Sequence, residues 1–101
     1  LLVVVAAGNE TQDLNFNPTY PASFKTSNMI VVGATHELGG LAYFSNFGLS
    51  KVDIASPGHA IFSSILRDRF DSWDGTSMAT PQVAGAAALI ISARPNLTPY
   101  Q

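Results

Sequence analysis

Three observations predict an α/β fold with a mostly parallel sheet. The runs at residues 1–7 and 29–34 are uncharged and rich in β-branched residues, as are strands buried on both faces of a parallel sheet. The uncharged stretch at 77–93 is rich in alanine, which predicts a helix packed closely against other elements. Polar segments that contain glycine or proline separate these elements.

The first strand ends at Gly8, and a polar segment follows it. This segment, 10–28, is interrupted by Pro18 and Pro21 and is therefore expected to be a loop. The further strands expected along the chain are one at 29–34, a short one at 52–55 closed by Ser56-Pro57-Gly58, and a hairpin formed by 60–65 and 70–73.

The helix at 77–93 has recognisable limits. It follows Gly75, carries Pro81 in its first turns and ends before Pro95. The dipeptide Thr98-Pro99 then repeats a helix-start signal close to the end of the sequence. The first strand has no preceding turn or cap, so we expect both ends of the chain to be cuts through structure.

The charge content supports that expectation. Charged residues make up 12% of the 101 residues, about half of the usual ~25%, while apolar residues reach 47%. The segments 1–9 and 76–93 carry no charge. So few charges cover a small free-standing domain poorly, which leaves two interpretations, a chain wrapped by a partner or a piece of a larger domain. We favour the second.

Composition also excludes several functions. The net charge is −2 and the five lysine and arginine residues are scattered, so we expect no nucleic-acid partner. Without cysteine there is no disulfide framework, cysteine zinc site or thiol nucleophile. The segment 76–93 is the only candidate membrane span, but its Thr, Ser, Pro and Gln residues favour a buried helix, so we expect no membrane partner.

Ser77 is the candidate catalytic residue. A nucleophilic serine needs an exposed hydroxyl, a base and donors for the oxyanion that forms. A glycine turn places Ser77 at the start of the helix, where free N–H groups and the helix dipole favour negative charge. On this reasoning alone a simple helix cap is the commoner role, so both interpretations stay open.

The residues around Ser77 resemble the nucleophile segment of the subtilisin-like serine proteases, the subtilases. The matching residues begin with Asp74-Gly75-Thr76-Ser77-Met78-Ala79-Thr80-Pro81 and continue to Leu89. Residues 3–10 are similar to the oxyanion-hole segment of the family. Further similar segments follow in the family's order, at residues 20–22, 30–35, 44–48 and 53–58. The resemblance covers essentially the whole chain.

The resemblance implies a function for individual residues. Ser77 would be the acylating nucleophile of a serine endopeptidase, and Asn9 would direct its side-chain amide at the oxyanion. From the residues alone, Asn9 would more commonly be a turn residue. The substrate-binding residues Ala6, Ala7 and Gly8 would form one wall of the pocket for the residue before the scissile bond. The family often has a cis peptide where this chain has Tyr20-Pro21.

The same resemblance implies a three-layer subtilisin-like fold of which residues 1–101 form only the C-terminal portion, truncated at both ends. The family's Asp-Ser/Thr-Gly and His-Gly-Thr segments are absent. Asp13, His59 and Ser77 have the order of a triad, but the surroundings of Asp13 and His59 do not fit, and neither do those of His36. We therefore expect the catalytic Asp and His in a missing N-terminal half of the same domain, and no proteolysis by these residues alone.

The remaining expectations follow from the family. The substrate would be a polypeptide, the setting secreted, and no cofactor would be required. The family commonly binds structural calcium, mostly through loops of the parent domain outside this stretch. The loop at 20–27 is similar to a region where some members hold a weakly bound cation by backbone carbonyls. The alternative is a pseudoprotease that keeps the fold as a binding or structural module. Other serine hydrolases fit poorly, because no Asp, Glu or His follows Ser77, as an α/β-hydrolase requires.

Overall fold

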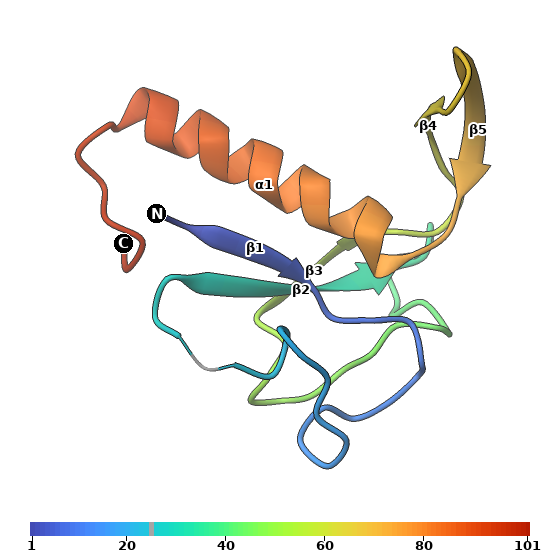
Figure 1. Cartoon of the computed structure of the whole chain (residues 1–101), viewed down its shortest axis with the longest axis horizontal. Coiled ribbons are helices and arrows are strands. Elements are labelled where there is room, and N and C mark those ends of the chain that lie inside the picture. Colours follow the sequence, from blue (N-terminus) through green and yellow to red (C-terminus); the bar gives the residue numbers. More distant parts are fainter. Residues whose placement is uncertain (25) are drawn as a thin grey trace.

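The computed structural model describes residues 1–24 and 26–101; Lys25 lies outside the described residues. A parallel three-stranded sheet in the order β1-β2-β3 forms its centre. The strands are β1, Val3–Ala6, β2, Met29–Thr35, and β3, Ile54–Pro57. The helix α1, Thr76–Ala93, crosses one face of the sheet (Figure 1). The predicted α/β architecture and parallel sheet are therefore present.

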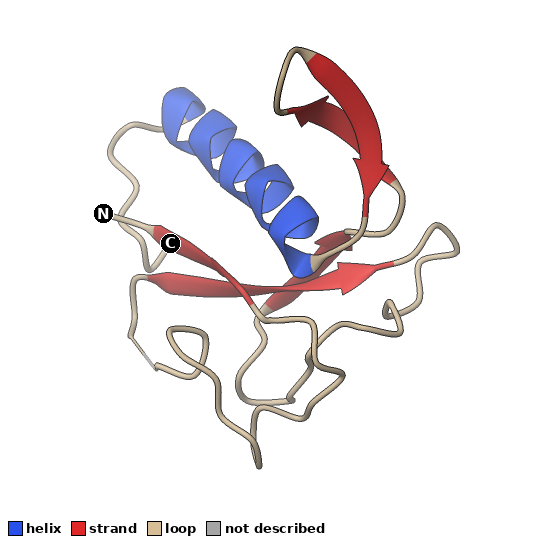
Figure 2. Ribbon diagram, turned by 45° about the vertical axis from the view of Figure 1, so that its right-hand side comes forward, coloured by secondary structure: helices blue, strands red, loops and turns tan. Residues whose placement is uncertain are grey.

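The central strand β2 is covered on both faces, because successive side chains of a strand point to opposite sides. The buried cluster beneath α1 consists of Val32, Ala34, Ala42, Phe44 and Ala79. The cluster on the other face consists of Ala7, Leu14, Ala22 and Val31. Loops form the layer on that second face (Figure 2). Burial on both sides explains why the 29–34 segment contains no charged residue.

The antiparallel hairpin consists of β4, Ile61–Ile65, and β5, Arg69–Trp73. It stands away from the sheet, beside the start of α1 (Figures 1 and 2). The rings of Phe62 and Phe70 stack across it with centroids 5.8 Å apart. Both rings are largely exposed. The sequence placed this hairpin within one residue at each end.

The third strand begins at Ile54, two residues later than predicted. The reason lies in Asp53, whose carboxylate accepts a hydrogen bond from the backbone N–H of Val31 at 2.8 Å. A side chain thus takes the place of a backbone acceptor at the start of the ladder. The strand then continues through Ser56 and Pro57, which the sequence assigned to the closing turn.

Burial on both faces was predicted for residues 1–7, but of these only Ala7 is completely buried. All four residues of β1 are half-buried, because β1 pairs with β2 along one edge only, and Leu1 is almost fully exposed. The helix is likewise covered on one side, with only Thr76 and Ala79 buried. No helix of the described part of the chain is long and apolar enough to cross a membrane.

Candidate active site

Ser77 is the second residue of α1, and its side chain is exposed. The N-terminal end of this helix lies at the carboxyl ends of the parallel strands, where ligands bind in open α/β sheets (Figure 1). The first turn contains no acidic residue, and Gly75 has no side chain to cap it. The positive end of the helix dipole is therefore left free for an anion.

Thr76 joins the helix start to the loop that follows β1. Its backbone N–H donates to Asn9 Oδ1 at 2.9 Å, and its hydroxyl donates to the same oxygen at 3.0 Å. The hydroxyl oxygen in turn accepts a hydrogen bond from the backbone N–H of Gly8 at 3.2 Å. Thr76 is 1% exposed, so these bonds are shielded from water. They hold Asn9 beside the residue that precedes Ser77.

These contacts determine which way the Asn9 amide points. A backbone N–H can only donate, so the Asn9 atom facing Thr76 is the oxygen. The nitrogen Nδ2 is directed away from Thr76 and lies 3.6 Å from the position that a Cβ on Gly75 would occupy. Asn9 itself is exposed, so an approaching ligand can reach this donor. The Ser77 hydroxyl, at the helix start, is exposed as well.

Two glycines let the chain segments approach this closely. Gly75, with φ +154°, adopts a backbone conformation that other residues rarely adopt. Its N–H donates to the carbonyl of Gly58, which follows β3, at 2.8 Å. A Cβ on Gly58 would lie 2.6 Å from Ala34 Cβ and 2.7 Å from the Gly75 oxygen. The turn before Ser77 therefore packs directly on the end of the sheet.

The segment predicted as a pocket wall is ordered by backbone and side-chain bonds. Ala7 donates its N–H to the Val32 oxygen at 2.9 Å and is completely buried. Ala6 and Gly8 are partly exposed and supply the accessible surface of this segment. Ala7 therefore lies behind the surface and can contribute to a pocket only by supporting its neighbours.

The two histidines contact residues other than Ser77. His59 Nδ1 lies 3.0 Å from a Glu37 carboxylate oxygen, and its Nε2 lies 3.8 Å from Asp74 Oδ2. His36 Nδ1 accepts a hydrogen bond from the Leu38 N–H at 3.1 Å. A hydrogen bond to backbone N–H lowers the pKa of Glu37, and the bond with His59 lowers that pKa further. These contacts are those of loop histidines.

Asp13 is also occupied locally. Its Oδ1 accepts a hydrogen bond from the Asn15 N–H at 2.9 Å, which closes a turn. The order Asp13, His59, Ser77 along the chain therefore corresponds to no assembled triad in the structure. The expectation that the base and its orienting acid belong to another segment stays a prediction.

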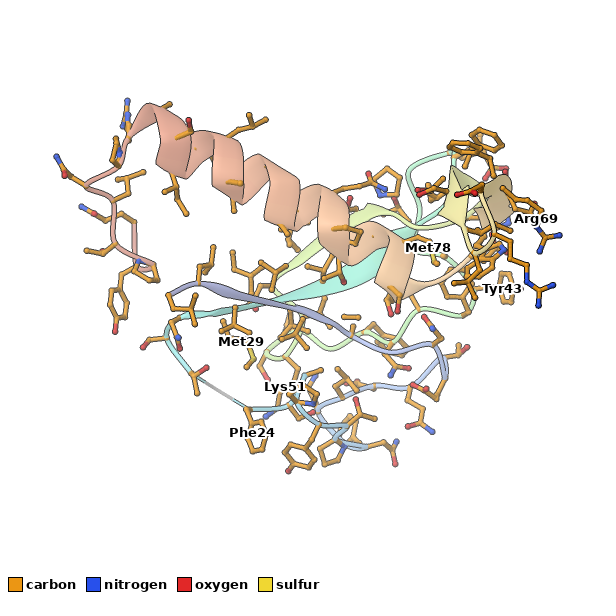
Figure 3. The ribbon with its side chains drawn as sticks, turned by 45° about the horizontal axis from the view of Figure 1, so that its top comes forward. Phe24, Met29, Tyr43, Lys51, Arg69 and Met78 are labelled. Carbon is orange, nitrogen blue, oxygen red and sulfur yellow. The ribbon has the colours of Figure 1, made fainter. Side chains whose placement is uncertain are left out.

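The loop at 20–27 was the place where a weak cation was considered. The Tyr20–Pro21 peptide is cis, as the resemblance implied. On the sheet face opposite α1, Lys51 lies near Phe24 and Met29 (Figure 3), and its Nζ donates to the Ser23 carbonyl at 3.3 Å. An ammonium group thus already bonds one carbonyl of this loop. Among the described residues no group of three or more His, Asp or Glu side chains could hold a metal ion. A weak cation held by backbone carbonyls of this loop stays a prediction.

Sequence reasoning assigned no role to two residues that organise this site. Thr76 was noted only as part of the serine motif, and Asn46 only as part of a matching segment at 44–48. The structure shows that both are almost completely buried and bond to the loop of Asn9. The available signal was a polar residue inside each matching segment. The partners of these two residues, however, lie 34 to 68 positions away and are visible only in the fold.

Known proteins place this arrangement in a family. The Subtilase family profile matches residues 1–101. The chain is 46% identical over 99 residues to an extracellular basic protease of Dichelobacter nodosus. That match covers 91% of this chain and 16% of the relative. It is 41% identical over 102 residues to subtilisin of Bacillus pumilus, which it matches over 100% of its own length and 36% of the relative's. The chain thus spans about a third or less of these relatives.

A solved structure agrees with the sequence relatives. A cold adapted subtilisin-like serine proteinase superposes with a TM-score of 0.84 and 41% identity, over 95% of this chain and 33% of that one. The fold is therefore subtilisin-like, present here as part of the domain. Since the family profile covers every residue and the fold agrees, the chain belongs to the subtilase family.

Proposed function

We propose that the protein containing these residues is a serine endopeptidase that cleaves polypeptides through an acyl-enzyme on Ser77. One observation carries the proposal. Asn9 and Thr76 are 67 positions apart, yet two hydrogen bonds from Thr76 hold Asn9 beside the nucleophile segment. The Asn9 amide nitrogen and Ser77, at the start of α1, therefore both lie at the exposed surface beside the Gly75 turn.

The chemistry proceeds by attack of Ser77 Oγ on the scissile carbonyl carbon, while the hydroxyl proton passes to a base. The base and its orienting carboxylate would come from the N-terminal half of the domain. The carbonyl oxygen becomes negative and accepts hydrogen bonds from Asn9 Nδ2 and the Ser77 N–H. The C–N bond then breaks, the amine leaves with the proton, and water hydrolyses the ester.

Residues 6–8 would line the pocket for the substrate residue before the scissile bond. Ala6 and Gly8 would contact that residue, with Ala7 behind them. We further propose that the protein is secreted, because one relative is named an extracellular protease. The reaction as written uses no cofactor. Any structural calcium would belong to the parent domain.

The test uses the full-length protein and a peptide substrate with a chromogenic leaving group. Asn9→Ala should lower kcat by about 10²–10³-fold with KM nearly unchanged, the loss known for a subtilisin that lacks its oxyanion-hole asparagine. Ser77→Ala should abolish both turnover and labelling by a fluorophosphonate. Asn17→Ala removes an exposed asparagine elsewhere and should leave kcat and KM at the wild-type values.

The outcomes separate the two candidate functions. Turnover that depends on Ser77 and on Asn9 supports the endopeptidase. A folded full-length protein without turnover or labelling would instead be the pseudoprotease, a binding or structural module. Turnover that survives Asn9→Ala unchanged would remove Asn9 from the oxyanion hole while leaving the protease assignment intact.

A further inference from the structure

We propose that Asn46 is a positioning residue for the oxyanion hole, fixing the loop that carries Asn9 without touching the substrate itself. This inference rests on the proposed function of Ser77 and Asn9. Its starting point is a fully buried asparagine whose side chain, among the residues that the structure describes, bonds only to residues 7–12.

The Asn46 amide has every hydrogen bond that an amide can form. Its oxygen Oδ1 accepts from the backbone N–H of Glu10 at 3.0 Å and of Gln12 at 2.9 Å. Its nitrogen Nδ2 donates to the Ala7 carbonyl at 3.0 Å and to a Glu10 carboxylate oxygen at 2.6 Å. Two donors and two acceptors use the complete capacity of the group, so its orientation is fully determined.

Backbone bonds add to the same connection. The Asn46 N–H donates to the Gly8 carbonyl at 2.9 Å, and the Phe47 N–H donates to the Gln12 carbonyl at 3.0 Å. The loop around Asn46 thus holds residues on both sides of Asn9. Asn9 itself makes no bond to Asn46, because its side-chain oxygen is bound by Thr76.

Close packing leaves this loop little room for an alternative position. A Cβ on Gly8 would overlap the Asn46 amide nitrogen and lie 2.7 Å from the Glu10 carboxylate. Gly8 also has φ +105°, a conformation that favours glycine. Asn46 and Thr76 therefore hold the Gly8–Asn9 turn from opposite sides, Asn46 from the loop layer and Thr76 from the helix.

This arrangement predicts a loss in kcat when Asn46 is changed. Catalytic donors act at full strength only when they are held where the charge develops, and a displacement of about 1 Å can cost about 10²-fold in rate. Asn46→Ala keeps the Asn9 side chain but frees the residues that flank it, which weakens the hydrogen bonds between Asn9 and Thr76. We expect kcat to fall about tenfold to 100-fold, less than for Asn9→Ala, with KM changed less than about threefold.

A matched control separates positioning from general destabilisation. Ser45 is also 0% exposed; its hydroxyl accepts from the Ala34 N–H and donates to the Asn46 carbonyl, both at 2.9 Å. It makes no bond to residues 7–12. Ser45→Ala should therefore also lower the melting temperature, because two buried hydrogen bonds are lost, yet keep kcat within about twofold of wild type.

A double variant that exchanges the amide of Asn46 and the carboxylate of Glu10 provides the test if Asn46→Ala does not fold. Asn46→Asp keeps both accepted bonds but places a carboxylate against the Glu10 carboxylate, so kcat should fall. Adding Glu10→Gln supplies an amide that can donate to the new carboxylate, which reverses the direction of the original bond. The double variant should recover at least fivefold of the lost kcat. Glu10→Gln alone should have little effect on kcat.

The experiment measures kcat, KM and melting temperature of these variants in the full-length protein. Equal kcat values for Asn46→Ala and Ser45→Ala, or no recovery in the double variant, would overturn the positioning role. If the wild type has no turnover, the proposed function fails by itself. Hydrogen exchange then decides the inference, because Asn46→Ala must deprotect the Thr76 amide relative to Ser45→Ala; equal protection refutes it.

Discussion

Replacing Thr76 by valine removes one hydroxyl from the connection between Asn9 and the nucleophile segment. Valine has nearly the same shape, so the change creates no cavity. The hydroxyl makes two hydrogen bonds, donating to Asn9 Oδ1 at 3.0 Å and accepting from the Gly8 N–H at 3.2 Å. The backbone N–H of Thr76 still reaches Asn9 Oδ1 at 2.9 Å. The variant therefore loosens Asn9 without releasing it.

The structure allows the size of the effect to be worked out. Each lost hydrogen bond contributes about 1 kcal/mol net, and leaving the Gly8 N–H unpaired in a shielded place adds about 1 kcal/mol. The free energy of unfolding should fall by about 2–3 kcal/mol. Because Asn9 keeps one of its two anchoring bonds, kcat should fall about tenfold, well short of the loss on deleting the amide. KM should change little, since the oxyanion forms only during reaction.

The assay combines urea unfolding with steady-state hydrolysis of a chromogenic peptide by the full-length protein. Thr76→Ser is the matched control, because it keeps the hydroxyl and removes only a methyl group. It should cost about 1 kcal/mol and leave kcat within about twofold of wild type. If Thr76→Val keeps the wild-type kcat while Asn9→Ala loses it, the Thr76 hydroxyl does not orient Asn9 and the reasoning is refuted.

Three further predictions follow from the same region. Gly58→Ala should lower the free energy of unfolding by about 2 kcal/mol or more in urea titrations and reduce kcat, because its Cβ would overlap the Gly75 carbonyl; an unchanged midpoint contradicts this. The Glu37 pKa is lowered from 4.5 by backbone hydrogen bonding and by His59, so this carboxylate stabilises the fold above about pH 4.5 and the stabilisation is lost as the pH falls below it. Wild type should therefore lose more stability than Glu37→Gln between about pH 6 and about pH 3, and parallel curves would contradict it. Residues 1–101 alone should not be labelled at Ser77 by a fluorophosphonate, and mass-spectrometric detection of the adduct would refute this.

The elements that could be predicted from the sequence are those whose pattern is local. The segment at 29–34 is apolar without interruption because β2 is buried on both faces, and this is visible in its composition. The helix and hairpin were predicted within one residue, because glycine, proline and charged turns mark their limits. The start of the third strand was misplaced, since it depends on a hydrogen bond that the Asp53 carboxylate accepts from the Val31 N–H on β2.

The candidate site divides in the same way. Ser77 and Asn9 could be named from sequence, because a nucleophile at a helix start and an asparagine after a strand lie in recognisable segments. Their arrangement could not, since Thr76 and Asn46 act through bonds to residues 34 to 68 positions away. A buried polar side chain looks like any other polar residue until its partners are known. The direction of the Asn9 amide in particular follows only from its bonds to Thr76.

The sequence by itself thus determined the fold class, the family resemblance and the choice of Ser77 as the candidate nucleophile, because each depends on residue types at short spacing. Only the tertiary structure decided how the site is held together. Gly58 brings the nucleophile turn onto the sheet, Thr76 fixes Asn9 from one side, and Asn46 fixes its loop from the other. These are hydrogen bonds and close contacts between distant segments, and they come into existence only when the chain packs around the parallel sheet.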